Sequence, residues 1–365
     1  MTKNIAILYG GESCEHDISI ITALSAYNII KWDFNAMLVY MKNGKFFIGE
    51  SLSKITTYSN FSANKLNEVF FQNGNILRKK RRTIQAQKID CALVCNHGGA
   101  GENGALSGFL EVNNIPYTCS GMVESGICLD KVLTKKVLDY YSFPYLKYKV
   151  LYKNYDISEL DNLDDFPYII KPAKLGSSVG ISVVRNKAEL IEGIKLGHLF
   201  CNKILIEKAL SNFEEFNCAA VMVNNKPVIS SIEKPIFNDN YLNFYEKYIT
   251  SNPQRELPAK ISNKLRMQIE DMTKALYIQL NLSGIVRIDY LYCNDTLYIN
   301  EINTVPGSLS TYLFKVNGLE PIELLSIVIE EAIIEFEKKR LFTMEFSSSV
   351  LDNFDAKQLK GGIKK

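Results

Sequence analysis

One apolar segment of the chain ends in side chains that carry oxygen atoms. Residues 297–310 read LYINEINTVPGSLS. If the segment begins as a strand, alternate side chains point to the same face, so Glu301 and Asn303 are predicted to share one. The apolar Leu297 and Ile299 precede them on that face. A buried face would therefore end in a carboxylate and an amide, directly before a Pro–Gly turn.

A second acid lies just upstream, because the segment VRIDY contains Asp289. A polar turn at residues 294–295 predicts that the two segments pair as an antiparallel hairpin, with Asp289 beside Glu301 and Asn303. Two carboxylates and an amide oxygen are the hard ligands that Mg²⁺ prefers, and Mg²⁺ usually completes its shell with substrate phosphates. The hairpin thus indicates a magnesium site beside a nucleotide. The alternative is a polar edge strand with no ligand.

A glycine- and serine-rich stretch, KPAKLGSSVG (171–180), is predicted to join two strands. Gly176 would allow close backbone approach, Ser177 and Ser178 add hydroxyls, and Lys171 supplies a positive charge for a phosphate. The stretch lacks the Gly-Lys-Ser/Thr ending of a P-loop. An ordinary hairpin loop is the competing interpretation, but a magnesium site further along favours a triphosphate grip.

A third stretch, ILIEKAL, begins as an apolar strand and ends at residues 207–210, which are Glu, Lys, Ala and Leu. The exposed backbone at such an end can hydrogen-bond the edge of an adenine, and Glu215 could hold ribose hydroxyls. Lone polar residues stand nearer the N-terminus: Glu15 and His16 open a predicted helix, and His97 precedes GGAGENG. An acid at a helix start is often only a dipole partner, and both histidines could be structural.

The elements that must position these residues begin with an open α/β unit. Residues 4–10 read as a buried strand, followed by a GGES turn and a helical pattern to about residue 30. Residues 92–118 repeat the order of strand, glycine-rich loop, helix and short strand. Residues 1 to about 125 are therefore predicted to form a doubly wound α/β domain, whose ligands lie at the carboxyl ends of strands.

The remainder of the chain reads differently. A helix is predicted at 130–143, then strands and hairpins from residue 144 to 233, a helix near 258–280, the acidic hairpin and a last helix at 320–339. The tail from Phe342 is polar. The basic run RKKRR (78–82) is interpreted as a solvated hairpin or loop, with an anion-binding patch as the alternative.

Composition narrows the class of protein. A chain of 365 residues usually holds two or three domains. The net charge of +2 gives no support to a general nucleic-acid or membrane-surface role. The 8 cysteines include no CxxC pair, which favours free thiols in a reducing compartment. We see no signal peptide and no apolar run of transmembrane length, so a cytoplasmic protein is expected.

Several motifs in one order resemble the D-alanine–D-alanine ligase family of the ATP-grasp superfamily. They are GGESCEHDISIITALSA, HGGAGENGALSGFLEVNNIPYTCSG, LDKVLTK, YIIKPAKLGSSVGISVV, FYEKY, RIDY and NEINTVPG, which lie between about residues 4 and 335. The resemblance implies an α/β domain at 1–125 followed by a two-part ATP-grasp fold. Its subdomains would span 126–210 and 211–340, with the nucleotide between two antiparallel sheets and a polar tail at 341–365.

The resemblance also assigns roles, position by position. The nucleotide would be held by Lys131, Lys171, Ser178, Glu207, Lys208, Leu210, Glu215 and Lys247. The metal ligands would be Asp289, Glu301 and Asn303, with Glu301 bridging two Mg²⁺ ions, which Mn²⁺ could replace. The catalytic set would be Glu15, Ser177, Tyr248, Arg287 and the backbone N–H of Gly307. The loop around 238–256 would be a lid.

Two positions depart from the family pattern. Asn103 replaces an acid in GENG, and Tyr312 stands where the family has a serine for the second substrate's carboxylate. His97 keeps the place of a substrate-side histidine. The expected function is ATP-dependent joining of two D-alanines through an acyl phosphate, for peptidoglycan synthesis, by a homodimer as the family suggests. The alternatives are a ligase with another second substrate, which Tyr312 favours, and a non-catalytic nucleotide-binding protein.

Overall fold

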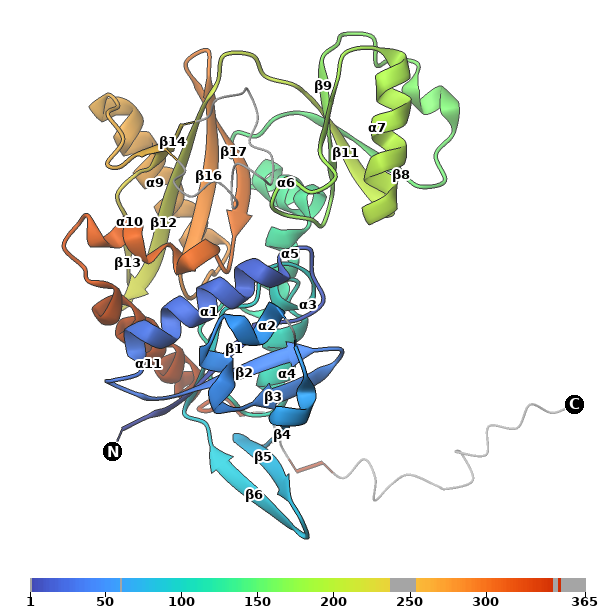
Figure 1. The fold of residues 1–365 in the computed structure, drawn as a ribbon. Coiled ribbons are helices and arrows are strands. Elements are labelled where there is room, and N and C mark those ends of the chain that lie inside the picture. Colours follow the sequence, from blue (N-terminus) through green and yellow to red (C-terminus); the bar gives the residue numbers. More distant parts are fainter. Residues whose placement is uncertain (1, 60, 237–253, 344–346, 349–365) are drawn as a thin grey trace, which may run out of the picture.

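The computed structural model describes residues 2–59, 61–236, 254–343 and 347–348. Lys247, Tyr248 and most of the predicted lid lie outside these residues, as does most of the tail. Three sheets organise the described chain (Figure 1), and a two-stranded ribbon of β14 (Lys234–Pro235) and β15 (Arg255–Glu256) accompanies them. None of the helices in the described residues is long and apolar enough to cross a membrane.

The N-terminal part forms a seven-stranded sheet, sheet A, in the order β6-β5-β4-β3-β2-β1-β7. Its strands are β1 (Asn4–Gly10), β2 (Asn35–Lys42), β3 (Lys45–Ile48), β4 (Asn67–Gln72), β5 (Asn75–Lys80), β6 (Thr83–Lys88) and β7 (Cys91–Val94). Its helices are α1 (His16–Ile30), α2 (Thr56–Ser59), α3 (Gly99–Glu102) and α4 (Ala105–Val112).

The predicted α/β arrangement is confirmed for one end of sheet A. Strand β1 is parallel to both β2 and β7 and is buried along nearly its whole length, as its apolar sequence requires. The other four strands extend the sheet by antiparallel pairing, which the prediction of a doubly wound sheet did not include. The basic run forms the exposed β5–β6 hairpin, which projects from the lower end of the molecule in Figure 1.

Sheet B has four antiparallel strands in the order β10-β9-β11-β8. They are β8 (Tyr148–Tyr152), β9 (Tyr168–Pro172), β10 (Ser182–Val184) and β11 (Lys203–Lys208). The predicted hairpin around 171–180 is β9–β10. Helix α7 (Lys187–Phe200) was not predicted; Asn186 caps its first turn, and its buried Leu190 and Ile194 pack on the sheet.

Sheet C also has four antiparallel strands, in the order β13-β12-β16-β17. They are β12 (Glu214–Val223), β13 (Lys226–Ile229), β16 (Val286–Cys293) and β17 (Thr296–Asn303). The predicted hairpin of the two acidic segments is β16–β17, and its turn residues Asn294 and Asp295 have φ of 49° and 57°. Helix α9 (Asn263–Gln279) packs on β12 and β13.

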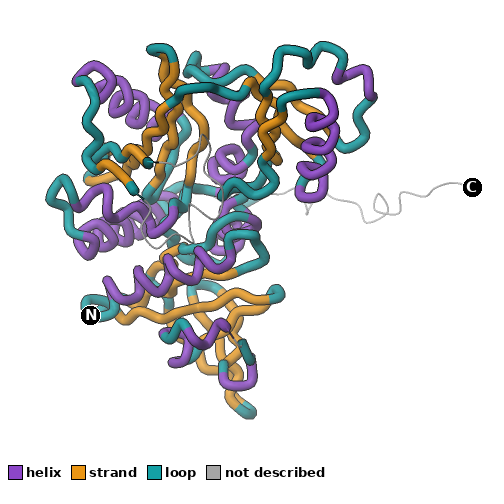
Figure 2. Tube along the Cα trace, turned by 45° about the horizontal axis from the view of Figure 1, so that its top comes forward, coloured by secondary structure: helices purple, strands orange, loops and turns teal. Residues whose placement is uncertain are grey.

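The remaining helices tie the sheets together, and Figure 2 shows them around the strands. They are α5 (Met122–Leu129), α6 (Lys131–Tyr140), α10 (Thr311–Lys315) and α11 (Pro321–Lys339). Helix α1 contacts β1 on one side and the single turn η4 (Gly307–Ser310) on the other, while α11 contacts α1, β7 and β12. The N-terminal part therefore packs directly against the loop that follows β17.

Candidate functional site

A cleft of about 760 Å³, including the part open to solvent, lies between sheets B and C. Its apolar wall contains Leu146, Ile169, Ile181, Leu210, Phe213 and Leu291. Its polar lining contains Lys131, Lys171, Ser178, Lys208, Glu215, Asn300 and Glu301. Seven of the residues that the sequence assigned to the nucleotide or the metal thus line this cleft. An eighth, Glu207, binds Lys171, which lines it.

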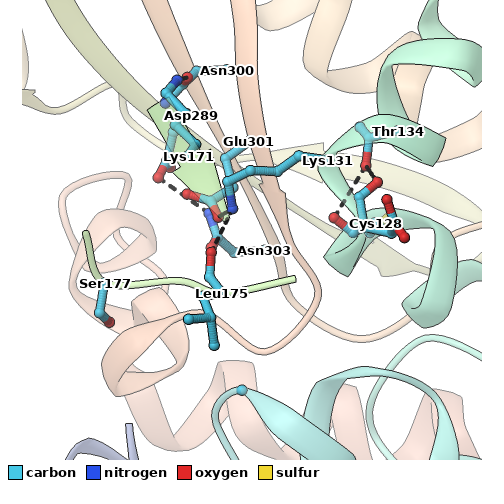
Figure 3. A network of polar contacts seen from close by, with 12 residues as sticks. Cys128, Lys131, Thr134, Lys171, Leu175, Ser177, Asp289, Asn300, Glu301 and Asn303 are labelled. Atoms are coloured by element: carbon cyan, nitrogen blue, oxygen red, sulfur yellow. Dashed lines mark hydrogen bonds and ion pairs between the residues drawn. The ribbon is translucent and has the colours of Figure 1, made fainter. Parts of the chain in front are cut away.

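Two buried lysines point from opposite elements toward the acidic hairpin (Figure 3). Lys131 begins helix α6, which Asp130 caps, and its Nζ lies 2.7 Å from both Glu301 Oε1 and the Leu175 carbonyl oxygen. Lys171 lies on β9, and its Nζ donates to Asn300 Oδ1 at 3.0 Å. Positive charge from helix and sheet therefore converges at the end of the β16–β17 hairpin.

A buried carboxylate holds Lys171 in place. Glu207 is the buried, next-to-last residue of β11, and its oxygens lie 2.8 Å from Lys171 Nζ and 2.7 Å from Lys135 Nζ. Burial alone would raise the pKa of Glu207, but the two lysines lower it to about 2. Burial in turn lowers the pKa of Lys135. Glu207 therefore contributes a structural ion pair to the lysines, and Lys135 is a residue that the sequence analysis missed, although it stands one helical turn after Lys131.

A β-bulge in β17 corrects the predicted alternation. Asp289 pairs with Glu301, but the next residue of β16, Tyr290, pairs with Ile299, so Asn300 is an extra residue in the strand. Beyond this bulge Ile302 enters the core with Leu297 and Ile299, and Glu301 does not share their face. Asn300 and Glu301 instead both line the cleft.

The predicted metal ligands lie on neighbouring strands and have protein partners. Arg287 holds Asp289 in a bidentate ion pair, with Nε–Oδ1 and Nη2–Oδ2 distances of 2.7 and 2.9 Å. The Asn303 amide donates to Asp289 Oδ2 at 3.1 Å. Burial opposes the charge of Arg287, but Asp289 raises the pKa of its guanidinium well above the ordinary value. Asp289, Asn303 and Arg287 therefore form one connected unit beside Glu301.

A smaller cavity of about 300 Å³ joins the cleft to the N-terminal part. Glu15, Glu102, Gly176, Glu301 and Asn303 line it, together with Cys128 and Thr304. Ser177 donates a hydrogen bond to Glu15 across this junction, so the loop 173–181 is tied to the start of α1. His16 faces elsewhere: its Nδ1 lies 2.6 Å from the Gly11 carbonyl oxygen and its Nε2 lies 2.9 Å from the Tyr40 hydroxyl, which is a structural role.

Glu102 is the acid of GENG that the sequence analysis passed over. Its carboxylate accepts the N–H of Gly98 at 2.9 Å and the N–H of Val305 at 3.3 Å. Burial, followed by the neighbouring Glu15, raises its pKa to about 8. The adjacent Asn103, which departs from the family pattern, accepts the N–H of Ala105 and does not enter either cavity lining. Glu102 thus connects the glycine loop to the segment after β17.

The turn that carries Gly307 has an unusual backbone. Ser308, Leu309 and Ser310 have φ of 51°, 50° and 46°, so three consecutive residues other than glycine are left-handed. This conformation costs L-residues roughly 1–2 kcal/mol each. Among the residues that the structure describes, apart from Gly307 and its two chain neighbours, no atom lies within 4 Å of the place where Gly307 would carry a Cβ, which leaves open space beside its backbone.

Side chains of the N-terminal part hold this turn. The Ser308 N–H donates to Thr22 Oγ1 at 3.1 Å, and Thr22 Oγ1 lies 2.9 Å from His97 Nε2. Burial lowers the pKa of His97 to about 4, despite its hydrogen bond to the backbone of Val305. A neutral His97 that accepts from Thr22 and donates to Val305 fits these contacts. His97 is therefore buried behind the turn.

Tyr312 lies on α10 and binds a side chain from another element. Its hydroxyl donates to Glu233 Oε2 at 2.8 Å, and its ring packs at the border of the core. Burial and the nearby Glu233 carboxylate raise the pKa of Tyr312. Neither residue at this contact was paired in the sequence analysis, because Glu233 and Tyr312 are 79 residues apart.

The predicted adenine edge runs along the end of β11. The backbone N–H of Ala209 donates to the Pro167 carbonyl oxygen at 3.0 Å, and Lys208 pairs with Asp165. Leu210 and Glu215 line the cleft next to Ile169 and Leu291. An apolar slot therefore continues from the lysine-lined part of the cleft.

The donor chemistry fits a nucleoside triphosphate with a divalent cation. Lysine amines, serine hydroxyls and loop N–H groups suit phosphates, and the apolar slot suits a flat ring. Asp289, Glu301 and Asn303 supply only oxygen ligands, which suits Mg²⁺. Among the residues that the structure describes, no group of three or more His, Cys, Asp and Glu side chains is arranged to hold a metal.

Comparisons with known proteins agree with this geometry. The family model "D-ala D-ala ligase N-terminus" matches residues 4–120, and "D-ala D-ala ligase C-terminus" matches residues 137–330. A curated D-alanine–D-alanine ligase of Thermosipho melanesiensis is 32% identical over 354 residues, which cover 94% of this chain and 97% of that protein.

Solved structures give the same result. The D-alanine–D-alanine ligase of Helicobacter pylori aligns with a TM-score of 0.79 and 26% identity, and the match covers 90% of this chain and 98% of that one. The D-alanine–D-alanine ligase of Bacillus anthracis, solved in complex with ATP, aligns with a TM-score of 0.68 and 25% identity, covering 93% and 100%.

Proposed function

Because the chain belongs to the D-alanine–D-alanine ligase family, we propose that it joins two D-alanine molecules and converts ATP to ADP and phosphate. The observation that carries the proposal is the convergence of Lys131, Lys171 and Glu301 in a cleft between two antiparallel sheets. The product would serve peptidoglycan synthesis, as it does in the family that the sequence resembles.

The nucleotide would occupy the cleft with its base in the apolar slot. Ile169, Leu210 and Leu291 would contact the ring, and Glu215 would take the ribose hydroxyls. Lys131, Lys171 and the loop around Ser178 would bind the phosphates. Lys247 completes this proposed set, but it lies outside the described residues.

The oxygen ligands for Mg²⁺ would be Asp289, Glu301 and Asn303. When bound, Mg²⁺ neutralises phosphate charge, and Mn²⁺ has the same preference for oxygen ligands. Glu301 and Asp289 already face Lys131 and Arg287, so their charges are balanced before any ligand arrives.

The first D-alanine would bind beside Glu15 and Ser177, in the smaller cavity that opens onto Glu301. Its carboxylate would attack the terminal phosphorus of ATP, which releases ADP and leaves an acyl phosphate. Positioning supplies much of the rate, and the residues of both cavities would shield the acyl phosphate from water. Tyr248, the third member of this proposed trio, lies outside the described residues.

The amine of the second D-alanine would then attack the acyl carbon, and phosphate would leave. The oxyanion that forms needs donors, which we assign to Arg287 and the N–H of Gly307. Asp289 orients the guanidinium of Arg287, while Thr22 holds the turn that carries Gly307. The open space beside Gly307 leaves room for substrate atoms.

The release of ADP and phosphate with D-alanine, compared with other amino acids and hydroxy acids, tests the proposal. D-Alanine-dependent release with formation of the dipeptide supports it. Release only with a different second substrate would favour the alternative ligase that Tyr312 suggests. Absence of release with every pair of substrates, in protein that binds ATP, would favour a non-catalytic nucleotide-binding protein.

A further inference from the structure

A row of polar side chains crosses sheet C. It begins at the proposed metal ligands and ends at Glu233. Glu301 pairs with Asp289, Asp289 pairs with Asn217 on β12, and Asn217 pairs with Glu233 through two backbone hydrogen bonds of 2.9 Å. Residues directly opposite one another on adjacent strands present their side chains on the same face. Glu233 therefore stands at the far end of the row that begins at Glu301.

Glu233 is a buried carboxylate with three side-chain partners. It accepts the hydroxyl of Tyr312 at 2.8 Å and the amide of Asn217 at 3.1 Å, both on Oε2. Its Oε1 lies 3.2 Å from Nη1 of Arg255. The proton of the Tyr312 hydroxyl is thus committed to Glu233, so the phenol has no proton left to donate to a substrate carboxylate.

Arg255 contacts both Tyr312 and Glu233. Its guanidinium carbon is 4.8 Å from the centre of the Tyr312 ring, and its side chain is 38% exposed while that of Glu233 is 6% exposed. A guanidinium carries five N–H groups, and Nη1 is the nitrogen that the ion pair with Glu233 engages within the described part of the chain. Arg287, the neighbouring arginine, is 18% exposed and held by both oxygens of Asp289.

We propose that Arg255 binds the carboxylate of the second substrate and so determines its specificity. This inference rests on the proposed ligase function. The ring of Tyr312 supports the guanidinium from below, Glu233 fixes its direction, and its remaining N–H groups present the planar fork that suits a carboxylate. The chain would thereby replace a hydroxyl donor at position 312 with a positive charge placed directly above that position.

The experiment compares acceptors that differ only in this carboxylate. D-Alaninamide can accept the acyl group through its amine but cannot be activated itself, so it reports the second site alone. The wild-type enzyme should prefer D-alanine to D-alaninamide as acceptor. In Arg255→Met, the KM for the second D-alanine should rise about tenfold to a hundredfold, the loss expected for charge-assisted hydrogen bonds, and the preference should collapse. The KM for ATP should stay within about twofold of the wild-type value.

Two further variants refine the test. Arg255→Lys keeps the charge without the fork, so its KM for the second D-alanine should lie between those of the wild type and Arg255→Met. It also decides the matter if Arg255→Met fails to fold. Arg340→Met is the matched control, because Arg340 also lies over an aromatic ring, Phe336 at 5.9 Å, on α11. That variant should keep the wild-type KM values for the second D-alanine and for ATP, and the wild-type preference for D-alanine over D-alaninamide.

The failure of the inference can be told apart from the failure of the proposed function. If the wild-type enzyme forms the dipeptide and both Arg255 variants keep its second-site KM and its preference for the carboxylate, the inference is wrong and the ligase function stands. If the wild-type enzyme releases no ADP with D-alanine, the proposed function itself fails.

Discussion

Glu301 and Gly176 line both cavities, and Glu301 is the charged residue of the two. Its carboxylate lies 2.7 Å from Lys131 Nζ, and it lines both the cleft and the smaller cavity. The side chain is therefore placed to act on the nucleotide and on the first substrate together. The negative charge of Glu301 matters more than its shape, because Lys131 and a divalent cation would both pair with this charge.

We expect Glu301→Gln to abolish D-alanine-dependent ADP release and to leave the fold largely intact. An amide supplies neither the negative charge that a bridging metal ligand needs nor the ion pair with Lys131. ADP release at saturating Mg²⁺ and circular dichroism measure the two effects. Glu335→Gln, on the exposed face of α11, is the control. Near-normal turnover of Glu301→Gln would remove Glu301 from the proposed metal site.

The site residues that lie within short sequence motifs could be predicted from the sequence. Lys131, Lys171 and Glu301 each belong to a recognisable stretch, and the structure brings them to one cleft. Two of the residues that were missed, Lys135 and Glu233, act through partners that are distant in sequence. Their partners, Glu207 and Tyr312, lie 72 and 79 residues away, and one chain without its fold carries no signal for such pairs.

At the scale of elements, the bulge in β17 decides which side chains reach the cleft. Strict alternation would have placed Glu301 on the same face as the buried Leu297 and Ile299. One extra residue, Asn300, reverses the order and returns Ile302 to the core. The sequence could not reveal this change, because a bulge is defined by the register of the partner strand.

The turn at 307–310 is an element held from outside, by Thr22 on α1. We expect Thr22→Val, which removes the hydroxyl, to lower kcat about tenfold, since one lost hydrogen bond of roughly 1–1.5 kcal/mol would loosen the turn that carries Gly307. Thr22→Ser restores the hydroxyl and should recover most of the rate. Equal kcat values in the valine and serine variants would show that the Thr22 contact does not position the turn.

Glu102 connects Gly98 to Val305, and it should make the stability of the protein depend on pH. Its folded-state pKa, raised to about 8 by burial and by Glu15, exceeds its ordinary value of 4.5. The stability that Glu102 contributes is therefore complete below the ordinary pKa and is lost as the pH rises through about 8. Glu102→Gln is neutral throughout but loses one of the two backbone bonds from Gly98 and Val305.

The variant should accordingly be less stable than the wild type near pH 5, and the difference should shrink as the pH approaches 9. Urea unfolding of the metal-free proteins between these values measures the difference. Parallel stability curves for the two proteins would mean that Glu102 does not titrate in this range.

At the scale of the whole molecule, the cleft separates two sheets that a nucleotide would connect. ATP with Mg²⁺ should therefore stabilise the protein against unfolding, by about 2.7 kcal/mol at a hundredfold excess over Kd. Lys171→Met should lose most of this stabilisation, because Lys171 lines the cleft. Lys174→Met, an exposed position in the loop that follows β9, should keep it. Thermal unfolding with and without ATP distinguishes them, and equal stabilisation of both variants would contradict the assignment of Lys171.

The overall architecture was predictable where local patterns are strong. The buried β1, the helix α1 and the β16–β17 hairpin have clear periodicity and turns, and all three were expected. The antiparallel extension of sheet A was not, because strand order depends on pairing between segments. Helix α7 had a capping signal at Asn186 that the sequence analysis overlooked. The division into domains at residues 125, 210 and 340 stays a prediction.

The dependence of the turn at 307–310 on Thr22, His97 and Glu102 has a consequence for how the chain is made. The N-terminal segment leaves the ribosome first during synthesis, and domains generally fold in the order in which they emerge. The three supporting side chains are therefore already present about 200 residues before the strained turn leaves the exit tunnel. A circular permutant that began after β17 would reverse this order, and its turn would emerge with no support to fold against.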